Sequence, residues 1–201
     1  MKEELLKINI QAKAEAAALF YSLLQNGFYI DSETGISLYD FLFKECGIDE
    51  EYITGTIKTV ILNNQPVDDY KKAVIRDGNV LSLSGPMPGL VGATMRAGGF
   101  YSSLRSSITY RDNDHSGESG RGMVFLKLFN LVMSDLGKKF LEAGIIYGTD
   151  ELKSFFADMK EDSWNDISSV GIDDQPAGID ELKDGNFGDV SSLALMKVNF
   201  V

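Results

Sequence analysis

The sequence predicts an α+β protein made of two related halves, each a small mixed sheet crossed by one or two helices. Two observations support this fold class. The stretch Thr59–Ser84 has the pattern of a strand, a polar turn, an acidic bridge, an Asp-Gly turn and a last apolar strand, and Ser169–Val198 repeats that order more weakly. The surrounding stretches Leu5–Ser84 and Met123–Phe200 are nearly equal in length. This pattern favours an internal duplication, with chance similarity between two generic patterns as the alternative.

Two dipeptides recur at matching places in the two stretches. Gln65-Pro66 corresponds to Gln175-Pro176, and Asp77-Gly78 corresponds to Asp184-Gly185. Both are residue types that end or turn a strand. They predict that each half has a hairpin followed by a second tight turn.

The chain of 201 residues is long enough for two small domains. The repeat places their boundaries so that residues 1–86 and 122–201 are the two halves. A glycine- and arginine-rich connecting segment, 87–121, joins them.

The residue pattern of the first half predicts elements in the order strand, helix, strand, helix, strand, turn, strand. Gly27 ends the first helix, and Ser37 with Asp40 three residues later is a capping-box pattern for the second. Asn63-Asn64 provides a turn, because Asn tolerates positive φ. The expected elements are Leu5–Ile10, 13–25, Phe28–Ile30, Leu38–Leu42, Ile57–Leu62 and Asn79–Ser84.

The second half predicts the same order of elements. Gly144 ends its first helix as Gly27 ends the first helix of the other half, and Asp173-Asp174 provides the hairpin turn. Trp164 is interpreted as a packing anchor. The expected elements are Met123–Phe129, Leu131–Leu141, Ile145–Tyr147, Thr149–Phe156, Ser169–Ile172 and Val190–Phe200.

Three short motifs in the first half resemble those of a known fold. Ser37–Leu42 is a helix of the Ser-Leu-x-Asp-Phe-Leu type, Ile61–Val67 is a strand with an Asn-containing turn, and Asp77–Leu83 is an Asp-Gly turn before an apolar strand. Together they resemble the β-grasp, or ubiquitin-like, fold, in particular the small sulfur carriers of thiamine and molybdopterin synthesis. The resemblance covers residues 28–89, and the helix at 13–25 departs from it. It implies a module that works by presenting a sheet face or edge to partners.

The connecting segment differs in composition from both halves. It contains four of the five arginines and many glycines, and its Phe100, Leu104 and Ile108 have the spacing of one helix face. One interpretation is a linker with one packed helix, whose arginines dock it on the halves. The other is a small-anion site, for which the candidate ligand-binding residues are Arg96, Gly98, Gly99 and Arg105.

The pair Gly98-Gly99 also resembles the Gly-Gly end of the sulfur carriers, which bears a thiocarboxylate. Here about half of the chain follows Gly99, so a carboxylate at this position would require cleavage. The polar stretch Asp112–Arg121 is expected to be a mobile loop.

The residue types argue against catalysis and against a metal or cofactor. His115 and Cys46 are the only histidine and the only cysteine, so the chain contains no zinc-ligand set of the usual kind. A Ser-His-Asp triad would need His115, which lies in the polar loop. We therefore expect no catalytic residues, no metal site and no cofactor.

The net charge of −11 repels phosphate backbones, so we expect no nucleic-acid partner. The longest uncharged run is broken by proline and glycine and is too short to span a bilayer, so we expect no membrane partner either. A single cysteine suits a reducing compartment, which favours a cytoplasmic location. The expected function is a non-catalytic binding or scaffold module with a protein partner. The alternative is a small-anion-binding or sulfur-carrier-like protein that uses Gly98-Gly99.

Overall fold

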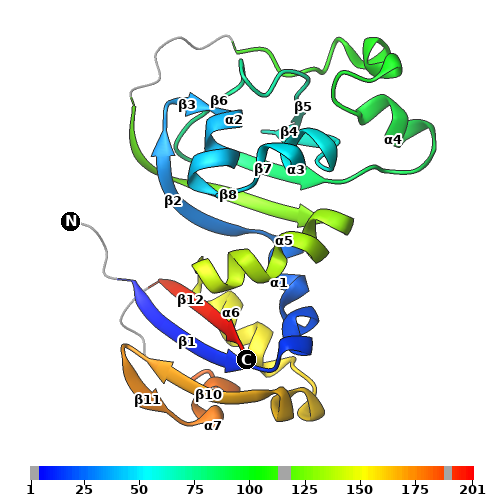
Figure 1. The fold of residues 1–201 in the computed structure, drawn as a ribbon. Coiled ribbons are helices and arrows are strands. Elements are labelled where there is room, and N and C mark those ends of the chain that lie inside the picture. The colour runs from blue at the N-terminus through cyan, green and yellow to red at the C-terminus, as the bar shows by residue number, and fades with distance from the viewer. Residues whose placement is uncertain (1–4, 113–118, 188–191) are drawn as a thin grey trace. The chain divides into compact units, whose positions relative to one another are not determined.

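The computed structural model describes residues 5–112, 119–187 and 192–201. The chain is mixed α/β, with strands and helices alternating along most of its length (Figure 1). It forms two compact units, one from residues 1–28 with 136–201 and one from 29–135. The boundaries fall inside strand β2 (Phe28–Thr34) and helix α5 (Asn130–Ala143).

In the first unit, five strands follow the order β11-β10-β1-β12-β9. The central pair, β1 and β12, is parallel, and the other neighbours are antiparallel. The strands are β1 (Leu6–Ala12), β9 (Ile145–Gly148), β10 (Ile167–Ile172), β11 (Gln175–Ala177) and β12 (Leu193–Phe200). The helices besides α5 are η1 (Ala14–Phe20), α1 (Tyr21–Asn26), α6 (Thr149–Ala157), η4 (Glu161–Asp166) and α7 (Ile179–Lys183).

Alternate residues of the central strands form the core of this unit. On β1 the fully buried side chains include Ile8 and Ile10, and on β12 they include Met196 and Val198. Burial of each large apolar side chain stabilises the fold by roughly 1.5–3 kcal/mol. Trp164 is buried, with its ring centroid 6.1 Å from that of Phe156, which confirms its expected role as a packing anchor.

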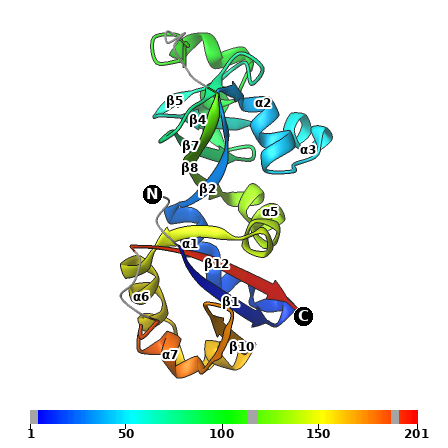
Figure 2. The ribbon, with the colours of Figure 1, turned by 90° about the vertical axis from the view of Figure 1, so that its left-hand side faces the viewer.

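In the second unit, five strands follow the order β5-β4-β7-β8-β2, and β3 and β6 form a separate small ladder. Strands β7 and β8 are parallel, and β4 is antiparallel to both β5 and β7. Helices α2 and α3 lie on one side of β4, β7 and β8 (Figure 2). The strands besides β2 are β3 (Ile36–Ser37), β4 (Thr59–Leu62), β5 (Gln65–Pro66), β6 (Val74–Ile75), β7 (Val80–Ser84) and β8 (Gly120–Phe129). The helices are α2 (Leu38–Asp40), η2 (Phe41–Glu45), α3 (Glu50–Gly55), α4 (Gly89–Met95) and η3 (Phe100–Arg105).

The two predicted hairpin turns are confirmed. Asn63-Asn64 has φ angles of 48° and 65°, and Asp173-Asp174 has φ angles of 47° and 62°. In each hairpin the residue before the turn pairs with the Gln that follows the turn, so the turn itself has two residues. Two-residue turns with positive φ match the right-handed twist of the strands that they connect. The Gln-Pro pairs then form the short strands β5 and β11, where a proline is tolerated because an edge strand needs fewer N–H donors.

The architecture of two separate β-grasp-like halves is not confirmed. Strand β1, from the first half of the sequence, lies between β10 and β12 of the second half. Strand β8, from the second half, pairs with β7 of the first. The compact units likewise divide the chain at 28/29 and 135/136 rather than at 86 and 122. Apolar alternation identifies a strand and its buried face but does not name its neighbour, so this exchange left no local signal.

Part of the core lies one residue away from the positions that the sequence pattern predicts. On β8 the buried residues are Val124, Leu126 and Leu128, whereas the expected Phe125 is half-buried and its ring lies 4.8 Å from that of Tyr29. The apolar pattern of the sequence predicts Leu19, Phe125, Phe155, Ile172 and Leu195 as core residues, and in the structure these five are only half-buried. The proposed cap of the second helix is confirmed, because Ser37 Oγ accepts a hydrogen bond from the Asp40 N–H at 3.0 Å.

Candidate functional site

The connecting segment is tied to the β4–β5 hairpin of its own unit. The Ala97 N–H donates to the Lys58 carbonyl at 2.8 Å, and the Tyr110 N–H donates to the Pro66 carbonyl at 2.9 Å. Between these points, α4 and η3 pack against each other. The segment is therefore ordered against the sheet, unlike a free linker.

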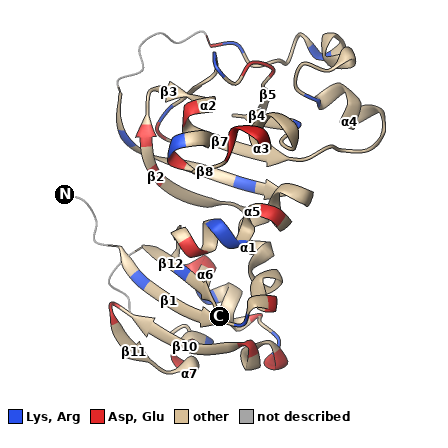
Figure 3. Ribbon diagram, in the orientation of Figure 1, with Lys and Arg blue, Asp and Glu red and all other residues tan. Residues whose placement is uncertain are grey.

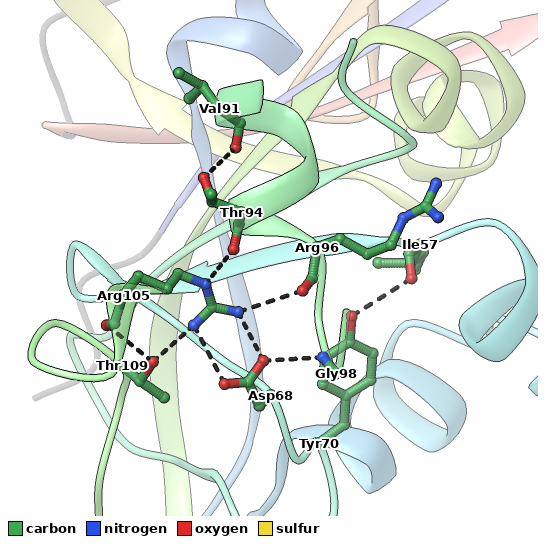
Figure 4. A network of polar contacts seen from close by, with 9 residues as sticks. All are labelled: Ile57, Asp68, Tyr70, Val91, Thr94, Arg96, Gly98, Arg105 and Thr109. Carbon is green, nitrogen blue, oxygen red and sulfur yellow. Dashed lines mark hydrogen bonds and ion pairs between the residues drawn. The ribbon is translucent and has the colours of Figure 1, made fainter. Parts of the chain in front are cut away.

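The Arg105 side chain is the centre of this attachment (Figure 4). It is only 4% exposed. Its Nη2 and Nη1 contact the two carboxylate oxygens of Asp68 at 2.6 and 3.2 Å. Its Nε donates to the Thr94 carbonyl at 2.6 Å, and its Nη1 donates to Thr109 Oγ1 at 2.7 Å. Such a two-pronged, mostly buried ion pair fixes orientation as well as adding energy.

The same carboxylate also accepts from the backbone of the glycine pair. The Gly98 N–H donates to Asp68 Oδ1 at 2.9 Å, and Gly98 has a φ of +60°, which favours glycine. The neighbouring Tyr70 hydroxyl lies 3.4 Å from the Ile57 carbonyl, and burial, followed by the charge of Asp68, raises the pKa of Tyr70. The anion held by this Arg and Gly pair is thus the chain's own Asp68, and an external anion would have to displace it.

The structure brings together only some of the predicted site residues. Arg105 and Gly98 meet at Asp68, whereas the Arg96 side chain is exposed and extends away from Asp68 (Figure 4). Arg96 contributes its carbonyl, which accepts from the Gly99 N–H at 3.1 Å and from Arg105 Nη2 at 3.4 Å. In the sequence, Asp68-Asp69 is a short acidic run of the kind that usually lies on a solvated surface. No local signal marks it, because its partner is 37 residues away.

The outward side of the same segment is apolar. Phe100 is 90% exposed, Leu104 70% and Val91 69%. We define the α4–η3 surface as the exposed apolar side chains of this segment: Leu90, Val91, Phe100, Tyr101, Leu104 and Ile108. Of the predicted helical stripe, Phe100 and Leu104 lie on η3 and Ile108 lies beyond its end. All three side chains are exposed, while the polar Arg105 is buried. The expectation of a stripe packed on the core is wrong, because the buried ion pair fixes the helix in the opposite orientation.

Two further arginines have acidic partners in the same unit. Arg76 Nη2 contacts both oxygens of Asp112, at 2.9 and 3.1 Å, and Arg121 Nε contacts Asp31 Oδ1 at 3.1 Å. Burial opposes the charged form of Arg76, yet its hydrogen bonds with Asp112 and Tyr110 leave its pKa raised. The ends of the predicted loop are thus held by ion pairs, while its central residues, 113–118 with His115, lie outside the described residues.

Arg96 and Arg111 differ from these arginines. Both are exposed, and neither has an ion pair with another residue that the structure describes. Residues 85–111 contain no Asp or Glu, and α4 carries no acidic residue in Figure 3. The segment with the α4–η3 surface therefore joins exposed apolar side chains to two exposed arginines, in a chain whose net charge is −11.

Among the described residues, no group of three His, Cys, Asp or Glu side chains is placed to hold a metal ion. Cys46 is buried at the end of η2. Within residues 5–112, 119–187 and 192–201, no helix has the length and apolar character needed to cross a membrane.

Comparison with models of protein families, with curated proteins and with solved structures finds no match to this chain.

Proposed function

We propose that this chain is a non-catalytic binding module that contacts a protein partner through the α4–η3 surface. The observation that carries the proposal is the combination of exposure and attachment. Phe100 is 90% exposed on a segment anchored by an Arg105 that is 4% exposed. Clusters of exposed large apolar side chains are uncommon on free-standing proteins and mark interaction surfaces.

The anchoring supports binding for a thermodynamic reason. A surface whose backbone is already fixed loses little conformational entropy when a partner docks. The ion pair of Arg105 with Asp68 and the backbone hydrogen bonds of Ala97 and Tyr110 supply that order before binding. Phe100 and Tyr101, whose ring centroids lie 5.1 Å apart, are the kind of aromatic anchors that dominate interface energies.

We further infer that both units are β-grasp-like and arose by duplication, with one strand of each half exchanged. In support, each unit has an antiparallel hairpin, then a parallel central pair, then a fifth strand, in the same order. Superposition of the two five-stranded sets tests this inference. Helices crossing opposite faces of the two sheets would contradict it.

A pull-down with matched variants tests the binding proposal. Three forms of the chain are immobilised on resin and incubated with native extract: the wild type, a Phe100→Ser/Leu104→Ser variant and a Phe43→Ser control. Bound proteins are then quantified by mass spectrometry. Phe43 is an exposed aromatic residue of the same unit, on η2 and outside the α4–η3 surface. We expect at least one protein that the wild type and the control retain and the double variant loses. If every retained protein binds the double variant equally, the α4–η3 surface is not the binding site.

A further inference from the structure

Resting on the proposed function, we infer that the partner segment bound by the α4–η3 surface is acidic as well as apolar, and that Arg96 and Arg111 are its charged contacts.

The charges on the segment carry the inference. Arg105 is neutralised by Asp68, so it offers nothing to a partner. Arg96 and Arg111 are exposed and have no ion pair with a described residue, and no acidic residue lies within 85–111. Exposed charges at the margin of an apolar contact steer partners of opposite sign and exclude those of like sign. A segment with Asp or Glu beside large apolar residues is complementary to this arrangement.

Other occupants fit less well. A second copy would bring the same two arginines to a symmetric contact, where like charges repel. An anionic lipid surface would attract these arginines, each by about 1 kcal/mol, but it would repel a chain whose net charge is −11. An acidic peptide is small enough to approach the local positive margin without facing the rest of the chain.

A random twelve-residue peptide display library is the probe. Peptides are selected on the wild-type chain and screened against Phe100→Ser/Leu104→Ser to keep those that need the surface. We expect the kept peptides to contain large apolar residues and an excess of Asp and Glu over the unselected library. Their affinity should fall about tenfold with Arg96→Glu/Arg111→Glu, as two margin ion pairs become two repulsions. A Lys160→Glu/Lys197→Glu control makes the same charge change on the other unit and should change their affinity little.

Each outcome separates the inference from the proposal beneath it. Surface-dependent peptides without an acidic excess, or with affinity unchanged in the arginine variant, overturn the inference and leave the protein-binding function intact. A library with no surface-dependent peptides overturns both. Sedimentation velocity of the wild-type chain and flotation with phosphatidylglycerol vesicles cover the other occupants. A dimer or vesicle binding that Phe100→Ser/Leu104→Ser abolishes would assign the surface to a second copy or to lipid instead.

Discussion

The hairpins β4–β5 and β10–β11 have the same turn but different continuations. Each has two residues with positive φ, a Gln-Pro edge strand and an antiparallel neighbour. The residues after proline differ, being Val67-Asp68 in one hairpin and Ala177-Gly178 in the other. Asp68 captures Arg105 and with it the connecting segment. Gly178 instead precedes α7, and its N–H donates to Glu181 Oε1 at 2.8 Å.

Two hairpins with the same kind of turn therefore support different surfaces in this chain. The turn and edge strand are local structures, set by residues with suitable φ and by proline. The two hairpins differ at the position two residues after proline. In the first hairpin Asp68 stands there and pairs with Arg105, and in the second Gly178 stands there as the residue before α7. The pair of Asp68 with Arg105 attaches the segment that carries the apolar α4–η3 surface.

The largest expected effect concerns the exchanged strands. A fragment of residues 29–135, which contains β8, should fold alone, whereas a fragment of residues 1–86 should not. The shorter fragment lacks the buried Val124, Leu126 and Leu128 of β8, and it exposes β1 without its partners β10 and β12. Near-ultraviolet circular dichroism and denaturant titration distinguish a cooperative fold from a collapsed chain. A cooperatively folded 1–86 fragment would restore the architecture of separate halves.

The next effect is loss of the anchor at the first hairpin. Asp68→Ala leaves the buried Arg105 without its counter-charge and should lower the free energy of unfolding by about 3 kcal/mol. Lys72→Ala, which breaks the exposed ion pair with Asp69, should cost less than about 1 kcal/mol. The double variant Asp68→Leu/Arg105→Met should recover most of the loss, because no buried charge remains. A cost for Asp68→Ala no larger than that of the Lys72 control, in urea unfolding, would contradict the anchoring role.

The sequence predicts local features of this structure well and long-range contacts poorly. Turns at Asn63-Asn64 and Asp173-Asp174, the Ser37 cap and the buried Trp164 were predictable because their signals are local. The position of β1 between β10 and β12 was not predictable, because the apolar pattern of a strand does not specify which strands it pairs with.

The candidate site has both local features, which the sequence indicates, and a contact between distant residues, which it does not. Arg105 and Gly98 do share an anion, but its identity as Asp68 depends on a contact between distant residues. The sequence spacing of Phe100, Leu104 and Ile108 predicts one helix face. Such spacing does not show how far the helix extends or whether that face is buried, and η3 ends at Arg105 with Phe100 and Leu104 exposed. The buried face of η3 is the one that carries Arg105, and the sequence does not indicate the partner of Arg105.

A smaller effect should distinguish the two turns. Asn64→Gly should raise the free energy of unfolding by about 0.5–1 kcal/mol, because glycine adopts positive φ without the steric cost that Asn carries. Asp174→Gly should gain less, because it also removes the ion pair in which Asp174 Oδ2 lies 2.8 Å from Lys7 Nζ. Thermal and urea unfolding of both variants measure the difference. A loss of stability in Asn64→Gly would mean that the Asn64 side chain supports the turn in a way that its backbone angles do not show.

The smallest effect is expected at Arg96, and it separates anchoring from recognition within the segment. Its side chain is exposed and has no ion pair with a described residue, while its carbonyl, which any residue supplies, accepts from Gly99 and Arg105. Arg96→Ala should therefore change the free energy of unfolding by less than about 0.5 kcal/mol. Arg105→Ala should cost several times more, because it removes a buried group and leaves Asp68 unpaired. The two variants, unfolded in urea side by side, test whether this pair of arginines divides its roles. A cost above about 1 kcal/mol for Arg96→Ala would show that its side chain holds the segment in place, and it would leave Arg111 as the one exposed arginine available to a partner within residues 85–111.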